Sequence, residues 1–336
     1  MIGHRGKDIE GLIAAVQPGL QAIFRTQRPV YLSTSSATGL MEAAVRNGAR
    51  KRVLSLVNGA FSDRFYRISL ACGIETDKLE VPLGNGFSAD QLSSALKGKD
   101  YDAVTVVHSE TATGALNPLE QLAKAAHAAG DVVLLVDSVS GVAGARIETD
   151  GWGLDYVLTG AQKAFALPPG LAFCAASENV LERAKQKKDR GIYFDLIEFD
   201  KYIRKNQTPN TPAVSLMFAL QVQVEHIMAE GIEARWARHD EMAQRTWRWV
   251  DEMRERGVGI SVLAPEGYRS PTVTCIRVPE GQTGSAINSA MKAKGFVIAP
   301  GYGSEKDMMI RIGHMGEHTL DELEVLLEAL GEVLTA

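Results

Sequence analysis

The chain has 336 residues, of which 45% are hydrophobic and 23% are charged. This length is enough for a large domain and a smaller one with separate cores, and the composition is that of a globular protein without low-complexity tracts. The formal net charge of −5 offers no general attraction to nucleic acid, and the densest basic stretch, Arg183 to Arg190, predicts a solvent-exposed helix face.

Short apolar runs alternate with amphipathic segments between Val30 and Ser177. This alternation predicts an α/β fold, with a mostly parallel sheet and helices on both faces. The expected strands are Val30–Ser33, Val53–Val57, Ala103–His108, Val132–Val136, Tyr156–Thr159 and Ala172–Ala176. Between the third and fourth runs, a helix is expected to begin at Pro118 and to end at Gly130. We therefore expect ligands beyond the carboxyl ends of these strands.

The sequence pattern changes after Pro212. Two long helices are predicted, at Ala213–Glu230 and Ile232–Arg256, and we place the domain boundary in the second of them. The large domain is expected at residues 1–240 and a smaller α+β domain at residues 241–336. The elements expected after the boundary are a strand at Thr272–Val278, a helix at Ser285–Lys294, an apolar run at Phe296–Ala299, a strand at Met308–Ile312 and a helix at Leu320–Leu334.

Asp137 and Lys163 each follow an apolar strand. A buried carboxylate such as Asp137 needs a cationic partner, unless it only caps the turn through Ser138 or Ser140, and its position alone does not decide between these readings. Burial of Lys163 would favour the neutral amine that Schiff-base chemistry requires. A lone lysine is more often a surface residue whose amine reaches solvent. The pairing with Asp137 at this spacing is what favours a catalytic role.

The segment Ser35–Gly39 lies between a strand and a helix that is expected to begin about Leu40. Free N–H groups and hydroxyls at a helix N-terminus bind anions, so the segment predicts a phosphate site. A serine or threonine cap with nothing bound is a commoner outcome for such a segment. The sequence has no Gly-Lys-Ser/Thr phosphate loop and no Gly-x-Gly-x-x-Gly motif, so a nucleotide site of those kinds is not expected.

Two further residues are candidates for ligand contacts. Phe61, which follows Asn58-Gly59-Ala60, is placed to lay its ring on a flat heterocycle, although an aromatic at a strand end is more often part of the core. Arg311 lies in the alternating run Met308–Ile312. A planar guanidinium that faces the cleft between the domains would bind a carboxylate through two hydrogen bonds. Taken alone, Arg311 would be read as an edge-strand arginine.

Taken together, these residues resemble the class V branch of fold-type-I pyridoxal-phosphate enzymes, above all the alanine–glyoxylate, serine–pyruvate and small phosphoserine aminotransferases. The most specific motifs are Leu-Val-Asp-Ser-Val-Ser from Leu135, Asp-Gly-Trp-Gly-Leu-Asp-Tyr-Val from Asp150 and Gly-Ala-Gln-Lys-Ala-Phe-Ala-Leu-Pro-Pro-Gly from Gly160. The resemblance implies a fold-type-I transferase that moves an amino group from a small amino acid, such as alanine or serine, to glyoxylate, pyruvate or 2-oxoglutarate.

The resemblance also implies roles for individual residues. Lys163 would hold pyridoxal 5'-phosphate as a Schiff base, Asp137 would pair with the pyridine nitrogen, and Arg311 would bind the substrate carboxylate. Further cofactor contacts are implied for Ser36, Ala37, Thr38, Phe61, Thr111 and Gln162. The family's usual Ser-Gly phosphate loop appears here as Ser-Ala, which is a departure from its pattern.

In this family a segment of the neighbouring subunit completes the phosphate site, so the resemblance implies a homodimer with shared active sites. The matching segment is Gln207–Pro212, within which Asn210 and Thr211 are expected to reach the phosphate. Its first residue is a glutamine where relatives commonly have a tyrosine. Relatives also usually begin earlier than Met1, so we expect the N-terminal segment of this chain to be shortened.

Three alternatives stay open from the sequence. His4 and Arg5 match a pair that helps to bind the substrate phosphate in phosphoserine aminotransferases, which makes that enzyme of serine biosynthesis the runner-up. A cysteine desulfurase would have a stacking histidine and a loop cysteine, but here Phe61 is at the stacking position and Cys174 and Cys275 lie in strand-like runs. An inactive scaffold on the same fold is the third alternative, and failure to turn over any substrate would favour it.

The cysteines and the N-terminus bear on the compartment. Cys72, Cys174 and Cys275 are far apart and lack Cys-x-x-Cys spacing, which predicts neither a disulfide framework nor a metal site and fits a reducing cytoplasm. No basic leader with an apolar run is present, and no apolar stretch approaches about 18 residues. We therefore expect a cytoplasmic enzyme with small-molecule substrates and with no membrane or nucleic-acid partner.

Overall fold

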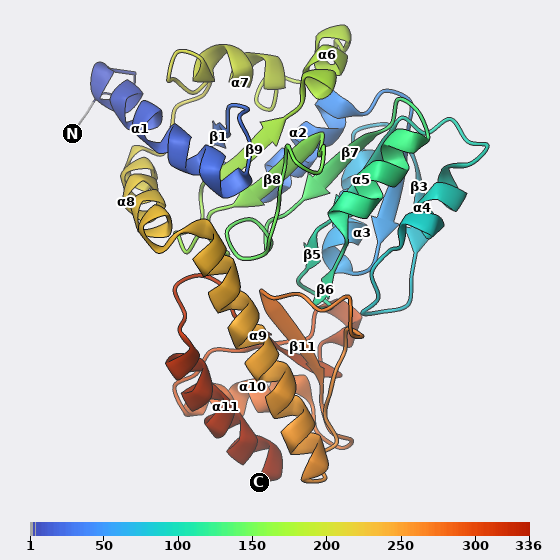
Figure 1. The fold of residues 1–336 in the computed structure, drawn as a ribbon, viewed down its shortest axis with the longest axis vertical. Coiled ribbons are helices and arrows are strands. Elements are labelled where there is room, and N and C mark those ends of the chain that lie inside the picture. The colour runs from blue at the N-terminus through green and yellow to red at the C-terminus, as the bar shows by residue number, and fades with distance from the viewer. Residues whose placement is uncertain (1–2, 4) are drawn as a thin grey trace.

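The computed structural model describes residue 3 and residues 5–336 of the chain. These residues are organised by two sheets, each with its own hydrophobic core. Figure 1 shows the larger sheet in the upper part of the molecule and the smaller one below it, joined by the long helix α9 (Ile232–Glu255). A short hairpin, β5 (Ser109–Glu110) with β6 (Ala115–Leu116), lies where the two parts meet.

The large sheet has seven strands in the order β1-β9-β8-β7-β4-β2-β3. Their bounds are β1 Tyr31–Ser33, β2 Arg52–Val57, β3 Glu75–Glu80, β4 Ala103–Val107, β7 Val133–Asp137, β8 Tyr156–Gly160 and β9 Ala172–Ala176. The mostly parallel α/β sheet predicted from the apolar runs is confirmed. Two details differ from the prediction, because β9 runs antiparallel to both of its neighbours and the edge strand β3 is too polar to form an apolar run.

Helices cover both faces of this sheet, which explains why its central strands β4, β7 and β8 are buried along their whole length. The helices are α1 Lys7–Phe24, α2 Ala37–Gly48, α3 Ala60–Ala71, α4 Ala89–Leu96, α5 Leu119–Ala128, α6 Glu178–Gln186, α7 Leu196–Ile203 and α8 Val214–Glu230. Helix α2 begins at Ala37 rather than near Leu40, so Ser36 becomes its N-cap residue. Within residue 3 and residues 5–336, no helix has both the length and the apolar character needed to cross a bilayer.

The small sheet is antiparallel, with four strands in the order β10-β11-β13-β12. Its elements are β10 Ser261–Val262, β11 Val273–Arg277, helix α10 Gly284–Ala293, β12 Ala299–Pro300, the 3-10 turn η1 Gly303–Glu305, β13 Met309–Gly313 and helix α11 Leu320–Thr335. Along α9, Trp236 packs into the upper core and Met242 into the lower one. The domain division between residues 240 and 241 stays a prediction.

The basic stretch that begins at Arg183 is not a uniform solvent-exposed face, so that part of the prediction is wrong. The side chain of Arg183 is only 1% exposed. Its guanidinium donates to the backbone carbonyls of Gly48 (3.1 Å), Asp102 (2.6 Å) and Asp131 (2.7 Å). Net charge along a helix does not reveal which basic residue turns inward, because that depends on carbonyls supplied by distant loops.

A second buried arginine connects the two parts of the molecule. Arg235, near the start of α9, has a fully buried side chain and donates Nη1 to Glu230 Oε2 at 2.6 Å. Its Nη2 donates to Glu317 Oε1 at 2.9 Å and to the carbonyl oxygen of Ala164 at 2.9 Å. Ala164 follows Lys163 in the loop after β8, and Glu317 follows β13. Arg235 therefore fixes the loop after β8 relative to the small sheet.

Replacement of Arg235 by methionine is expected to destabilise the protein by about 2 kcal/mol, because it leaves the buried carbonyl of Ala164 without this donor and removes an ion pair from Glu230 and from Glu317, which keep only Arg238 and Gln223. Guanidinium unfolding followed by circular dichroism measures this change. Arg254→Met on the same helix is the matched control, since Arg254 is 61% exposed in its pair with Asp251, and we expect a change within about 0.5 kcal/mol. Equal effects of the two variants would contradict a bridging role for Arg235.

Candidate active site

A cavity of about 330 Å³ lies at the carboxyl ends of the parallel strands. Strands β2, β4, β7 and β8 all end at this edge of the sheet, and β1 ends there too because it runs antiparallel to β9. Ligands of open α/β sheets bind at this edge. The sequence-predicted residues that line the cavity are Ser36, Ala37, Thr38, Phe61, Thr111, Asp137, Gln162 and Lys163.

Asp137, the last residue of β7, has a buried side chain that faces this cavity. Its Oδ1 accepts a hydrogen bond from the backbone N–H of Val139 at 2.9 Å, so the turn-capping contact considered from the sequence is present. In the described part of the chain, the carboxylate has no other hydrogen bond. Burial raises the pKa of Asp137 to about 7, and the nearby Glu110 adds to this shift. The carboxyl group is therefore suited to a proton-bearing partner inside the cavity.

Lys163 lies in the loop after β8 with its side chain half-buried. Within residues 5–336, its amine has neither a hydrogen bond nor an ion pair. Burial lowers the pKa of Lys163, the cation Arg311 lowers it further, and Asp137 opposes the shift. A larger fraction of the amine is therefore neutral at a given pH than for an exposed lysine, and the neutral amine is the nucleophilic form.

The N-terminus of α2 forms one wall of the cavity. Ser36 caps this 12-residue helix with an extended backbone, but its hydroxyl makes no capping hydrogen bond. The first turn contains no acidic side chain, and the N–H groups of its first residues, Ala37 and Thr38, have no intrahelical partner. Together with the helix dipole, these free donors favour an anion at this position.

The fully buried Glu110 holds the segment that carries Phe61, and sequence reasoning missed it. Glu110 Oε2 accepts from the backbone N–H groups of Phe61 at 3.1 Å and Ser62 at 2.8 Å, while Oε1 accepts from that of Ala112 at 3.1 Å. A side chain at Gly59 would collide with Glu110, whose Cγ lies 2.4 Å from the ideal Cβ position. Burial raises the pKa of Glu110 and these donors oppose the shift. The sequence offered one indication of Glu110, because it is the acidic residue of the motif His-Ser-Glu-Thr-Ala-Thr-Gly that also contains Thr111.

Arg311 reaches the edge of the cavity from the small sheet. Its Nε donates to the carbonyl of Pro300 at 2.9 Å and its Nη1 to the carbonyl of Thr111 at 3.3 Å. Thr111 is itself held by a hydrogen bond between its hydroxyl and that of Ser140, at 2.7 Å. Among the described residues, no carboxylate pairs with Arg311. The guanidinium is thus fixed by carbonyl oxygens and keeps its positive charge for a ligand.

The remaining predicted residues do not line this cavity. Asn210 donates its side-chain amide to the carbonyl of Tyr193 at 3.2 Å, and Thr211 is exposed. Arg5 is exposed ahead of α1, and His4 lies outside the described residues. Within one chain, the structure therefore does not bring Asn210, Thr211 or Arg5 to Lys163.

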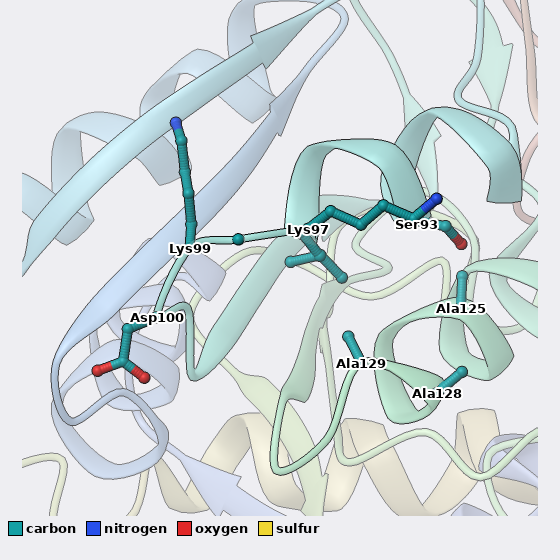
Figure 2. A pocket seen from close by; sticks show the side chains of 9 residues that line it. Ser93, Lys97, Lys99, Asp100, Ala125, Ala128 and Ala129 are labelled. Carbon is teal, nitrogen blue, oxygen red and sulfur yellow. The ribbon is translucent and has the colours of Figure 1, made fainter.

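A larger hollow of about 690 Å³ lies elsewhere, between the C-terminal ends of α4 and α5. Figure 2 shows that it is lined by alanine side chains and that the labelled polar side chains point in different directions. Two of its three charged residues are occupied outside the hollow, since Lys99 contacts Asp77 and Asp100 pairs with Lys51, and Lys97 is the third. No chemical groups converge there, so the smaller cavity around Lys163 is the candidate active site.

Comparison with known proteins points to one family. A family model described as "Aminotransferase class-V" matches residues 34–316. The chain is 37% identical over 322 residues to an uncharacterized aminotransferase of Methanocaldococcus jannaschii, an alignment that covers 94% of this chain and 82% of that protein. It is 33% identical over 326 residues to an L-aspartate–glyoxylate aminotransferase of Paracoccus denitrificans, with 95% and 81% covered.

The fold agrees with the sequence similarity. The crystal structure of an alanine–glyoxylate aminotransferase from Nostoc sp. superposes on this chain with a TM-score of 0.92 at 26% identity. The superposition covers 99% of this chain and 89% of that one. The fold-type-I architecture expected from the sequence is thereby confirmed.

The raised pKa of Asp137 predicts a pH-dependent stability of the cofactor-free protein. Folding raises this pKa from about 3.9 to about 7, so the folded state binds the proton more tightly than the unfolded state. The corresponding stability is complete below the unfolded pKa and is lost as the pH rises through the folded pKa. Asp137→Asn cannot ionise, so its stability advantage over the wild type should grow between about pH 4 and pH 7 and then level off.

Urea unfolding of both cofactor-free proteins across this pH range measures the difference. Asp251→Asn is the control, because Asp251 is 52% exposed on α9 and its replacement should not change the pH dependence between pH values of about 4 and 7. A stability difference between Asp137→Asn and the wild type that does not vary with pH would mean that Asp137 is ionised throughout.

Proposed function

Because the chain belongs to the class V aminotransferase family, we propose that it uses pyridoxal 5'-phosphate to move an amino group from a small amino acid to an oxo acid. The observation that carries this proposal is the presence of Lys163 and Asp137 in one cavity. One is an amine with a lowered pKa, and the other is a buried carboxyl group with a single hydrogen bond. When bound, the cofactor would supply a ring that accepts electrons from the substrate's α-carbon.

The side chains of the cavity have complementary roles in this proposal. Lys163 would hold the cofactor covalently through Nζ and, when freed, would move the substrate's α-proton with the same atom. Asp137 would keep the ring nitrogen protonated through a charged hydrogen bond. Phe61 would contact the flat ring, and the free N–H groups at Ala37 and Thr38 would bind the phosphate. Thr111 and Gln162 make the remaining polar contacts.

Arg311 binds the α-carboxylate that amino-acid donors and oxo-acid acceptors share. Its two carbonyl contacts hold the guanidinium in one orientation, and this would fix the α-hydrogen relative to Nζ of Lys163. Alanine or serine as donor and glyoxylate, pyruvate or 2-oxoglutarate as acceptor are the substrates we propose. The names of the relatives, which include aspartate–glyoxylate and alanine–glyoxylate aminotransferases, support this substrate class. Nothing in the described residues favours phosphoserine, and the cytoplasmic location stays a prediction.

A homodimer with shared active sites is part of this proposal. Asn210 and Thr211 do not line the cavity of their own chain, which leaves them available to the cavity of a partner. Apolar side chains are also exposed on the part of the chain that carries the large sheet, since Phe218 and Val222, one turn apart on α8, are 46% and 52% exposed and Ile192, between α6 and α7, is 87% exposed. Exposed apolar groups of this size are typical of protein interfaces, and a two-fold axis would bury each of them twice.

The first test concerns Lys163. Borohydride reduction of the wild-type protein with pyridoxal phosphate should yield one covalently labelled peptide that contains Lys163, and Lys163→Ala should yield none. Lys187→Ala is the matched control, because Lys187 is also partly buried with a lowered pKa but donates to the carbonyl of Ala49 far from the cavity. A labelled peptide that persists in Lys163→Ala would refute the assignment.

The same preparation tests the reaction itself. Alanine, serine and aspartate are each supplied with glyoxylate, pyruvate or 2-oxoglutarate, and the new amino acid is measured by chromatography. We expect transfer with at least one pair and its loss in Lys163→Ala. Absence of transfer by a protein that carries the cofactor would favour an inactive scaffold.

The second test concerns the shared site. Lys163→Ala and the double variant Asn210→Ala, Thr211→Ala are each expected to have little activity. A hybrid dimer of the two would contain one site with Lys163 from one subunit and the intact segment from the other. Mixing after subunit exchange should therefore restore activity to about a quarter of the wild-type level at most, as expected for one intact site in half of the dimers. Exchange confirmed by mass spectrometry without any recovery would argue against sharing.

A further inference from the structure

The cavity has one cation more than the proposed reaction uses. Arg64 lies on α3 one turn after Phe61, and its side chain lines the cavity together with Lys163 and Asp137. Sequence analysis did not identify it, although residues three apart on a helix share a face. Its guanidinium carbon lies 5.0 Å from the centre of the Phe61 ring. This position places a permanent positive charge at the substrate cleft.

Arg64 has no carboxylate partner among the described residues. Its polar contact is a hydrogen bond of 3.2 Å from Nη2 to the hydroxyl of Tyr302, a residue of the small sheet region. Of the buried carboxylates nearby, Glu110 accepts from several donors at the N-terminus of α3. The charge of Arg64 lowers the pKa of Asp137, but the two side chains form no ion pair in the described part of the chain. A half-buried guanidinium with only a neutral partner is a binding group for an anion that comes from outside the chain.

Tyr302 relates Arg64 to Arg311 in space. The guanidinium carbon of Arg311 lies 5.8 Å from the centre of the Tyr302 ring, while Arg64 contacts the hydroxyl at the end of the same ring. The Tyr302 ring also packs on Phe61, with 5.3 Å between ring centres. The two guanidinium groups thus contact one tyrosine side chain, one from each part of the molecule, next to the cavity-lining residues Phe61 and Thr111.

We propose that Arg64 binds the distal carboxylate of a dicarboxylic substrate while Arg311 binds its α-carboxylate. Substrates of this class are aspartate and glutamate as donors and their oxo acids as acceptors. A substrate with one carboxylate leaves Arg64 without an anion, whereas a dicarboxylate supplies a charged hydrogen bond to each arginine. The inference rests on the proposed aminotransferase function and narrows it, because it makes aspartate or glutamate a better donor for this site than alanine or serine.

A binding experiment tests this inference without requiring turnover. The holoenzyme is titrated by calorimetry with succinate, a dicarboxylate that has no amino group to react, and with butyrate as the monocarboxylate of the same chain length. We expect succinate to bind more tightly, and Arg64→Gln to reduce this preference about tenfold to a hundredfold, as for the loss of one charged hydrogen bond. Arg67→Gln is the matched control on the same helix, because Arg67 is 67% exposed and pairs with Asp63.

Steady-state kinetics give the second readout. The ratio of kcat/KM for aspartate to that for alanine should fall in Arg64→Gln by a factor similar to the loss in succinate preference. Arg64→Lys keeps the charge but not the fork of donors and should give an intermediate ratio. If Arg64→Gln does not fold, Arg64→Lys replaces it in both measurements.

Three results would overturn the inference. The first is equal binding of succinate and butyrate by the wild type, and the second is an unchanged preference for succinate in Arg64→Gln. The third is a loss of bound cofactor in Arg64→Gln with an unchanged ratio of kcat/KM for aspartate to that for alanine, which would make Arg64 a cofactor residue. Transfer from alanine without any dependence on Arg64 would reject the dicarboxylate site and leave the aminotransferase function standing. Absence of transfer from every donor would reject the function, while succinate binding would still decide the role of Arg64.

Discussion

The constraint on which the site depends is the burial of a carboxylate at the end of a central strand. Asp137 ends β7 between two parallel neighbours and is 3% exposed, and burying such a charge is costly unless a proton or a cation compensates it. Its raised pKa expresses this cost. The neighbouring strands end at the same edge of the sheet and place Lys163 and Phe61 around one cavity. The sheet therefore sets the geometry of the cavity, and the buried carboxylate of Asp137 favours a cationic partner within it.

The small sheet completes this arrangement from the other side. Arg311 on β13 and Tyr302 before η1 both reach the cavity mouth, and neither belongs to the large sheet. Arg235 holds the loop after Lys163 to the segment after β13 through Ala164 and Glu317. Lys163 and Arg311 are therefore carried by segments that the buried Arg235 connects, which favours a fixed distance between them rather than independent motion of the two parts.

Charge balance connects the site to its substrates. Lys163, Arg64 and Asp137 line the cavity, and Arg311 lies beside it through its contact with the carbonyl of Thr111, whereas Glu110 is occupied by backbone donors. In the proposed function, backbone N–H groups and the helix dipole at the α2 N-terminus would bind the cofactor phosphate without these side chains. Arg64 and Arg311 would then be left for substrate carboxylates, which is the basis of the proposed preference for dicarboxylates.

The α/β sheet, the two long helices and the candidate residues at the strand ends could be predicted from the sequence, because apolar periodicity and the polar residue after each run are local properties. It did not determine the direction of β9, the burial of Arg183 or the contact of Arg64 with Tyr302. These features depend on strand order and on packing between residues far apart in the chain, 238 positions in the case of Arg64 and Tyr302. A contact between distant segments does not change the hydrophobic pattern of either segment. Which charged side chains face the cavity therefore follows from tertiary packing and could not be predicted from the sequence.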